Sequence, residues 1–272
     1  MPQHADPASG AERSHSFTFA VQLLIILAAF GASLLTLISG FGLGTLMLPV
    51  FALFFPLPIA VGMTAVVHLL NNAFKSAMLW RNVDLAMVLR FGLPSMLGAF
   101  VGALVLGQLG ELTPLYMGVR VAVGPLALSL AVLMVLFGIA ELSPRISGIT
   151  IQGRHLFAGG LVSGFFGGLS GHQGALRSMF LLNSGMRKEA YIATGVAIAM
   201  LVDITRIPLY LHHVGTGQLQ REWPLLAGSV LAAFLGAWWG KRLIPKITYR
   251  TVQIAVGGLL MGIAGMLVAG II

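Results

Sequence analysis

The sequence contains no cysteine and very little charge. Only 9% of its 272 residues are Asp, Glu, Lys or Arg, whereas a soluble domain carries about 25%. The lack of cysteine excludes disulfides, Cys-ligated metals, iron–sulfur clusters and thiol chemistry. The shortage of charge excludes a water-soluble core, since 57% of the residues are hydrophobic and the mean hydropathy is +0.94. A lipid bilayer is therefore the solvent that this fold must satisfy.

Long apolar runs recur along the chain and predict membrane-spanning helices. They fall at about 18–38, 58–80, 85–108, 116–140, 154–183, 188–212, 223–243 and 249–271. Most can cross a hydrocarbon core of about 30 Å at about 1.5 Å per residue. The expected fold is an all-α integral membrane protein of about eight transmembrane helices. Residues 1–16 are polar, lack the features of a cleaved signal peptide and are predicted to form a disordered tail.

Glycine interrupts two of the apolar regions. The first break is the sequence SGFGLG at 39–44, and the second lies between Gly164 and Gly174 in the fifth run. Irregular backbone at membrane depth is tolerated only where it lines a cavity or is buried in protein. Both regions are therefore predicted to be broken or re-entrant helices.

The two halves of the chain resemble each other in three places. The matching pairs are AFVGA at 99–103 with AFLGA at 233–237, IAVG at 59–62 with IATG at 192–195, and SGF at 39–41 with SGF at 163–165. Their common order predicts a duplicated four-helix unit, with repeats at 17–146 and 147–272. An even number of spans in each unit would place the halves parallel, whereas re-entrant segments at the breaks would place them inverted. Glycine-interrupted segments at corresponding places in two halves point to the binding site of a transporter.

One polar stripe falls in the second apolar run. His68, Asn71, Asn72 and Lys75 are spaced i, i+3, i+4, i+7 and share one helix face. Such a stripe in lipid must face protein or water, and it could bind an anion. The alternative is hydrogen bonding between helices, with Lys75 extending to the membrane interface.

A second polar group, Asp203, Thr205 and Arg206, lies at the equivalent place in the second half. Asp203 and Arg206 are three residues apart and could pair on one helix. In the functional interpretation, Arg206 meets the substrate while Asp203 holds Arg206 or carries a proton. The alternative is a neutral pair that serves stability alone.

The third group is the second glycine break itself. Gly171, His172, Gln173 and Gly174 are followed by Arg177 inside an apolar run. A half-helix that starts near Gly174 would aim its positive end at the break, which suits an anion. From the first break, Gly42 and Gly44 would contribute backbone donors. The alternative is close helix packing at glycine, with the polar side chains bonded to neighbouring carbonyls.

The sequence contains few features of an enzyme, a metal site or a nucleic-acid-binding protein. The chain has no Walker loop, nucleotide fingerprint, HExxH motif or nucleophile elbow, so neither an enzyme nor a cofactor is predicted. His212 and His213 fit solvated loop histidines better than a metal pair. The basic residues are scattered over loops and span ends, which favours lipid headgroups over nucleic acid. A small anion and membrane lipids are the expected partners, and a homo-oligomer stays open.

The paired glycine-rich segments at 39–44 and 160–168, within the duplicated layout, resemble the sulfite exporter TauE/SafE family of bacterial membrane transporters. The resemblance covers residues 20–272. It implies an inner-membrane, multi-pass transporter of sulfite, sulfonates or related organosulfur anions. The segment GLSGHQGALRS at 168–178 is similar to one branch of that family and departs from the commoner triple-glycine form.

The predicted function is secondary transport of a small anion through a polar site at the glycine breaks. No ATP-binding motif is present, so either a gradient supplies the energy or the flow is passive, and Asp203 or His172 could couple a proton to the anion. An anion channel and a non-transporting membrane partner remain as alternatives.

Overall fold

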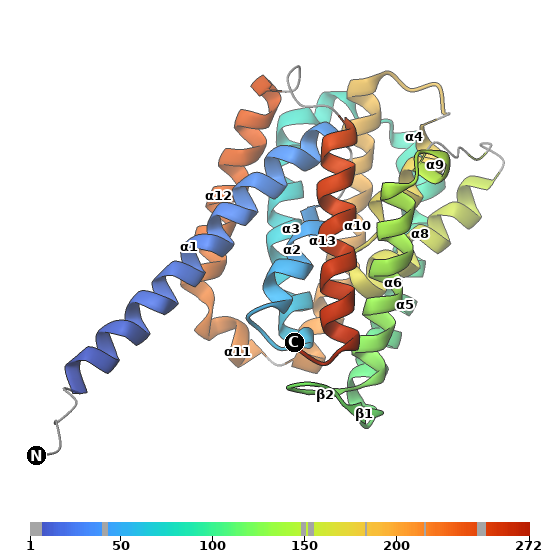
Figure 1. Cartoon of the computed structure of the whole chain (residues 1–272). Coiled ribbons are helices and arrows are strands. Elements are labelled where there is room, and N and C mark those ends of the chain that lie inside the picture. Colours follow the sequence, from blue (N-terminus) through green and yellow to red (C-terminus); the bar gives the residue numbers. More distant parts are fainter. Residues whose placement is uncertain are drawn as a thin grey trace, which may run out of the picture.

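The computed structural model describes residues 7–39, 43–147, 151, 155–182, 184–214, 216–243 and 249–272 (Figure 1). The longer helices are α1 (Pro7–Ser39), α3 (Leu57–Leu79), α5 (Leu93–Glu111), α6 (Pro125–Leu142), α8 (Leu156–Ser170), α10 (Lys188–Val214), α12 (Trp223–Leu243) and α13 (Tyr249–Val268). The shorter ones are α2 (Leu43–Ala52), α4 (Leu85–Met87), α7 (Pro144–Ser147), α9 (Gly174–Leu181) and α11 (Thr216–Arg221). A 3-10 turn, η1 (Trp80–Asn82), and a π-helical segment, η2 (Val88–Gly92), lie between α3 and α5, and strands β1 (Tyr116–Met117) and β2 (Ala122–Val123) form a small antiparallel hairpin.

The fold is that of an all-α membrane protein. Within the described residues, six segments are long and apolar enough to cross a bilayer: Phe19–Thr36, Leu57–Asn82, Leu85–Glu111, Pro125–Leu142, Lys188–His213 and Trp223–Gly240. Three shorter apolar helices accompany them, at Leu43–Ala52, Leu156–Ser170 and Gln253–Val268. Large apolar side chains such as Leu27, Phe100 and Leu231 are exposed, whereas His68, Asp203 and Arg206 are buried. This distribution suits lipid outside the bundle and polar contacts within it.

Helix α1 starts earlier than the sequence predicts. It begins at Pro7, inside the segment 1–16 that was expected to be disordered. Proline is tolerated at the first helical position, and the Ala, Glu and Arg residues that follow favour helix. The helix lies obliquely against α12 and its first turns project beyond the bundle (Figure 1).

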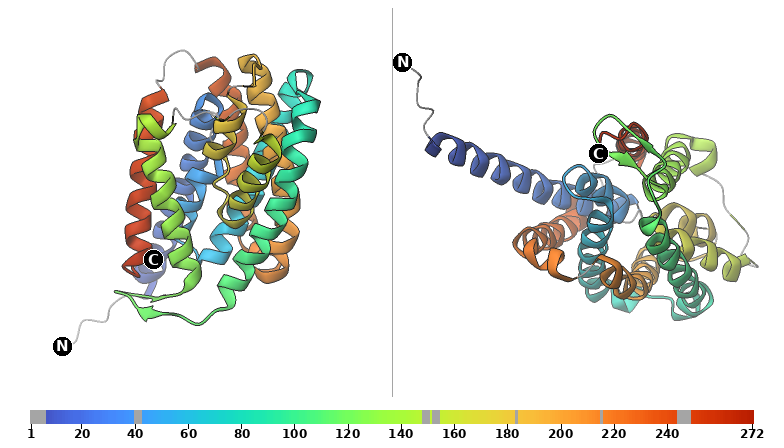
Figure 2. Two further views of the ribbon diagram at one scale, coloured as in Figure 1. Left: turned by 90° about the vertical axis from the view of Figure 1, so that its right-hand side faces the viewer. Right: turned by 90° about the horizontal axis from the view of Figure 1, so that it is seen from below.

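Two pairs of central helices are antiparallel. Near one end of the bundle, the backbone N–H of Asp84 after α3 donates to the Thr194 hydroxyl in the first turns of α10. In the other pair, Arg250 at the start of α13 donates to the carbonyl oxygen of Leu142 at the end of α6. Figure 2 shows α6 and α13 side by side.

Of the two arrangements, these helix directions fit inverted halves and not parallel ones. The predicted duplication would pair α3 with α10 and α6 with α13, and each pair runs in opposite directions. The physical reason lies in the short helices, which turn the chain back inside the bundle. Ile151, just before α8, donates its N–H to the carbonyl of Met179 near the end of α9. The end of α9 thus returns to the end of the bundle where α8 begins.

Glycines bring α5 and α8 into backbone contact. A Cβ placed on Gly164 would lie 2.0 Å from the carbonyl oxygen of Ser95, and one on Gly168 would lie 2.1 Å from that of Ala99. On the α5 side, a Cβ on Gly102 would lie 2.1 Å from the carbonyl oxygen of Phe165. Small residues four apart allow such close approach between membrane helices. This contact holds the end of α8 in place at the glycine break.

Candidate functional site

The second glycine break separates α8 from α9. Helix α8 ends at Ser170, and Gly171 follows with φ +81°, a left-handed conformation that favours glycine. The N–H of Gly171 donates to the carbonyl of Gly167. His172 and Gln173 bridge to α9, which begins at Gly174. The break predicted from glycine is therefore present, although α9 is only one short helix of 8 residues.

The first glycine break meets the second. Gly42 lies outside the described residues, but Gly44 is buried in the first turn of α2. A Cβ placed on Gly44 would lie 3.6 Å from the carbonyl oxygen of Gly171 and 3.7 Å from the ring of His68. Two segments far apart in the sequence thus converge beside the polar stripe of α3.

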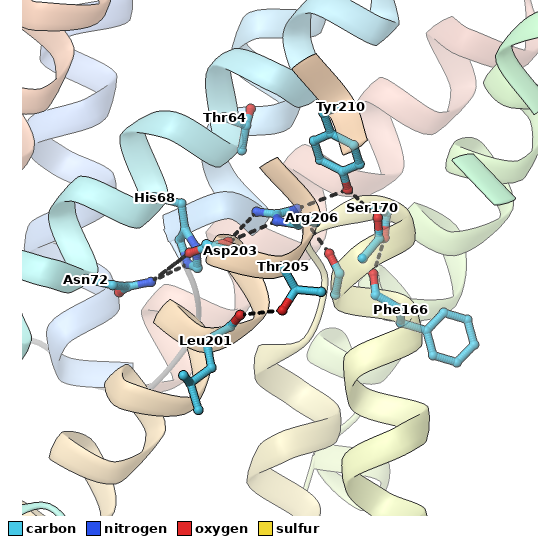
Figure 3. A network of polar contacts seen from close by, with 12 residues as sticks. Thr64, His68, Asn72, Phe166, Ser170, Leu201, Asp203, Thr205, Arg206 and Tyr210 are labelled. Carbon is cyan, nitrogen blue, oxygen red and sulfur yellow. Dashed lines mark hydrogen bonds and ion pairs between the residues drawn. The ribbon is translucent and has the colours of Figure 1, made fainter. Parts of the chain in front are cut away.

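A buried ionic cluster joins α3 to α10. His68 Nδ1 donates to Asp203 Oδ2 over 2.6 Å, and Arg206 Nε donates to Asp203 Oδ1 over 2.9 Å. Asn72 Nδ2 also donates to Asp203 Oδ2, at 3.4 Å. Figure 3 shows Asp203 between His68 and Arg206. The predicted pair of Asp203 and Arg206 forms, while the Thr205 hydroxyl donates to the Leu201 carbonyl of its own helix.

Arg206 connects this cluster to the second break. Its Nη1 donates to the carbonyl of Gly167 at 3.0 Å, and a Cβ on Gly171 would lie 3.1 Å from the same nitrogen. The hydroxyl of Tyr210 donates to the carbonyl of Gly168 and accepts a 3.5 Å bond from Arg206 Nη1. A buried guanidinium therefore lies against the irregular backbone of the break.

Sequence reasoning missed Tyr210 and the bond between His68 and Asp203. One signal could have found Tyr210, which lies four residues after Arg206 on the same face of α10. The bond between His68 and Asp203 joins two helices and leaves no such signal in the sequence.

The polar stripe on α3 contacts two neighbouring helices. His68 and Asn72 face α10, whereas Asn71 and Lys75 face α1. Lys75 Nζ donates to the Thr36 hydroxyl at 3.3 Å and, with the Asn71 amide oriented to satisfy both of its ends, to the Asn71 oxygen at 3.1 Å. Lys75 is only 3% exposed. Its ammonium therefore stays inside the protein and does not reach for the membrane interface.

The side chains of the second break have unmet hydrogen-bonding capacity. His172 is buried, stacks on Phe137 with centroids 5.4 Å apart, and contacts the Ser170 hydroxyl through Nδ1 at 3.0 Å. Among the described residues, neither its Nε2 nor either amide atom of the fully buried Gln173 has a hydrogen-bond partner. Buried polar atoms without partners are rare in folded proteins and need an explanation. A polar ligand at this break would provide one.

Arg177 lies deeper in the same region. It is 5% exposed, on α9, and a Cβ placed on Gly195 of α10 would lie 3.3 Å from its Nε. Nearby, the hydroxyl of Tyr191 donates to that of Ser178 and ties α10 to α9. The side chain of Arg177 thus lies against the backbone of α10 at Gly195.

Positive charge exceeds negative charge around the two breaks. The buried charged residues that the structure describes on α3, α9 and α10 are Lys75, Arg177, Asp203 and Arg206. Charged groups inside membrane helices are costly and mark ion or substrate pathways. Among the described residues, no three His, Cys, Asp or Glu side chains are grouped as metal ligands. His213, near the end of α10, donates through Nδ1 to the carbonyl of Leu209.

A helical membrane bundle with charged residues buried at broken helices is typical of membrane transporters. Residues 25–267 match the family model described as Sulfite exporter TauE/SafE. The chain therefore belongs to the TauE/SafE family, whose description implies membrane transport of sulfite or related anions. Comparisons with curated proteins and with solved structures gave no match.

Proposed function

We propose that this protein is a secondary transporter that carries sulfite, a sulfonate or a related small organosulfur anion across the bacterial inner membrane. The main support is the convergence of the two glycine breaks beside Arg206. A mobile anion crossing a low-dielectric interior needs donors and positive charge at the middle of its path. The side chain of Gln173 supplies an amide donor and the guanidinium of Arg206 supplies positive charge.

The proposed site includes residues from both glycine breaks, from the polar stripe of α3, from α9 and from α10. It comprises Gly42, Gly44, His68, Asn71, Asn72, Lys75, Gly171, His172, Gln173, Gly174, Arg177 and Arg206. Within it, Arg206 is partly neutralised by Asp203, whereas Gln173 has both amide atoms to offer. We assign Gln173 and His172 to direct contact with the anion, and Asp203 to orienting Arg206.

The proposed architecture is a duplicated unit of four long helices, so that eight helices in all lie at membrane depth. The pairing of the helices supports this proposal. Helix α1 packs on α12 as α8 packs on α5, and α3 contacts α12 as α10 contacts α5. In this scheme α2 and α9 are the short half-helices, and the two units are inverted relative to each other. Inverted repeats allow one half to rock against the other around a central site.

Flux measurements in vesicles test this function. Purified protein in lipid vesicles should take up labelled sulfite saturably in oxygen-free buffer, with competition from a sulfonate and less from sulfate. Arg177→Ala should abolish the flux, whereas Arg221→Ala, which removes an exposed arginine of α11, should leave it intact. Monodisperse elution of each variant shows that it is folded. If folded wild-type protein carries none of the three anions, the proposed function is wrong.

The same vesicles test proton coupling through Asp203 or His172. An imposed pH gradient should drive sulfite accumulation in the wild type if a proton moves with the anion. Asp203→Asn or His172→Gln should then lower the accumulation by more than it lowers the downhill flux. Throughput far above carrier rates would instead favour a channel, and full tolerance of His172, Gln173, Arg177 and Arg206 to substitution would favour a non-transporting partner.

A further inference from the structure

A cavity of about 110 Å³ lies against the polar cluster on the side of Tyr210. On α10 its lining residues are Tyr210 and His213, which follow Arg206 in the helix, whereas Asp203 precedes it. Leu106 and Gly110 line it from α5, and other lining residues come from α3 and α6. In this measure a single water needs about 10–15 Å³. The cavity therefore has room for a small oxyanion with some of its water.

The cavity continues towards the surface at one end of the bundle. A second cavity, of about 540 Å³, shares Pro58, Gly110 and Leu126 with the first. Its other lining residues include Val123 of β2 and the final residue described, Ile272. Figure 1 shows β2 and the C-terminus at the same end of the bundle. The two cavities adjoin at these shared residues, with the smaller one at Tyr210, and we call the two together the funnel.

Tyr210 forms the inner boundary of the funnel. It lines the cavity, yet it is only 3% exposed and its hydroxyl is bonded to the carbonyl of Gly168 in the break. The guanidinium carbon of Arg206 lies 5.6 Å from the centre of the tyrosine ring. Figure 3 shows Arg206 between Asp203 and Tyr210. One aromatic side chain thus separates the cavity from the buried arginine.

Gly107 of α5 has no side chain and so leaves room for the ring of His213 of α10. A Cβ placed on Gly107 would lie 2.2 Å from His213 Nε2. The Nδ1 of His213 donates to the carbonyl of Leu209 at 2.8 Å, which fixes the ring and leaves Nε2 towards α5. Glu111, the last residue of α5, is exposed and also lines the cavity. The smaller cavity is therefore lined by His213 and Glu111 as well as by Tyr210.

We propose that this funnel is the vestibule through which the transported anion reaches Arg206 from the end of the bundle that carries the β1–β2 hairpin. This inference rests on the proposed transport function. It adds the end of the bundle from which the anion enters and the cavities through which it passes. In this conformation the site communicates with that end of the bundle through Tyr210.

Thiol labelling tests the vestibule, since the natural chain contains no cysteine. The test variant is Gly110→Cys, where the nearest atom to a new Cβ is 3.8 Å away. The matched control is Gly262→Cys on α13, an exposed glycine with nothing within 4 Å. A sulfonated, membrane-impermeant maleimide is applied to either face of oriented vesicles. A thiol in water reacts as the thiolate, so Gly110→Cys should label at least about tenfold faster than the lipid-facing control, and from one face only.

Two readouts keep this inference separate from the proposed function. Labelling needs no transport, so equal labelling of the two variants, or labelling from both faces, overturns the vestibule even if sulfite flux is normal. Conversely, one-sided labelling with no flux of any anion contradicts the proposed function. When both hold, modification of Gly110→Cys should block sulfite flux, whereas the treated Gly262→Cys protein should transport as before. Undiminished flux through the modified Gly110→Cys protein would also overturn the vestibule.

Discussion

At the scale of single residues, a substitution at Gln173 distinguishes a role in anion binding from a role in packing. Its buried amide has no hydrogen-bond partner among the described residues, and such a group costs about 1–3 kcal/mol of stability. Gln173→Leu should therefore leave the melting temperature in detergent unchanged or raised. Sulfite flux should fall at least about tenfold, because a hydrogen bond to a charged ligand contributes about 1.5–3 kcal/mol. Gln108→Leu, at an exposed position of α5, is the control for the change in side chain. A variant that loses stability but keeps its flux would assign Gln173 to packing.

Much of the residue-level site could be predicted from the sequence, because polar side chains are conspicuous in apolar runs. Helical spacing correctly paired Asp203 with Arg206. Spacing within one helix could not show that His68 reaches Asp203, since that bond joins two different helices. Nor could it separate the two sides of the α3 stripe, where Lys75 turns to α1. Tyr210 was missed because a tyrosine in an apolar run is usual and carries no formal charge.

At the scale of elements, the glycine contact between α5 and α8 is the feature most sensitive to change. A methyl group on Gly164 would come within 2.0 Å of the Ser95 carbonyl, which is backbone and cannot rotate away. Gly164→Ala should therefore force the helices apart, at a cost of about 1–3 kcal/mol typical of overpacking. Thermal unfolding in detergent should show a melting temperature several degrees lower. Gly262→Ala, with open space around it, should unfold like the wild type. Equal stability of the two variants would show that α5 and α8 are not in backbone contact.

The helices themselves could be predicted from hydropathy, and the second break could be predicted from glycine, since both depend on local composition. The directions in which the helices run could not be predicted in this way. Whether a short helix crosses the bundle or turns back depends on contacts such as that between Ile151 and Met179. Those contacts lie outside any one apolar run. Counting every run as a full crossing gives parallel halves, whereas counting the breaks as re-entrant gives inverted ones.

At the scale of the whole molecule, charge beside the smaller cavity of the funnel should regulate the approach of an anion. Glu111 is exposed and lines the cavity. A carboxylate roughly 10 Å from a passing monovalent anion in water repels it by about 0.4 kcal/mol, which halves its local concentration. Glu111→Gln should therefore raise the initial rate of sulfite uptake about twofold at low salt, from the face where Gly110→Cys is labelled.

Two controls, high salt and a distant glutamate, test whether the faster uptake by Glu111→Gln comes from its position in the vestibule. The Debye length is about 10 Å at 0.1 M salt and about 3 Å at 1 M, so the advantage of Glu111→Gln should vanish at high salt. Glu189, an exposed residue in the first turn of α10, lies at the opposite end of the bundle. Glu189→Gln should leave uptake from the Gly110 face unchanged, because its charge is a membrane thickness away. An equal acceleration by both variants would mean that net charge, and not the position of Glu111 at the funnel, controls the rate.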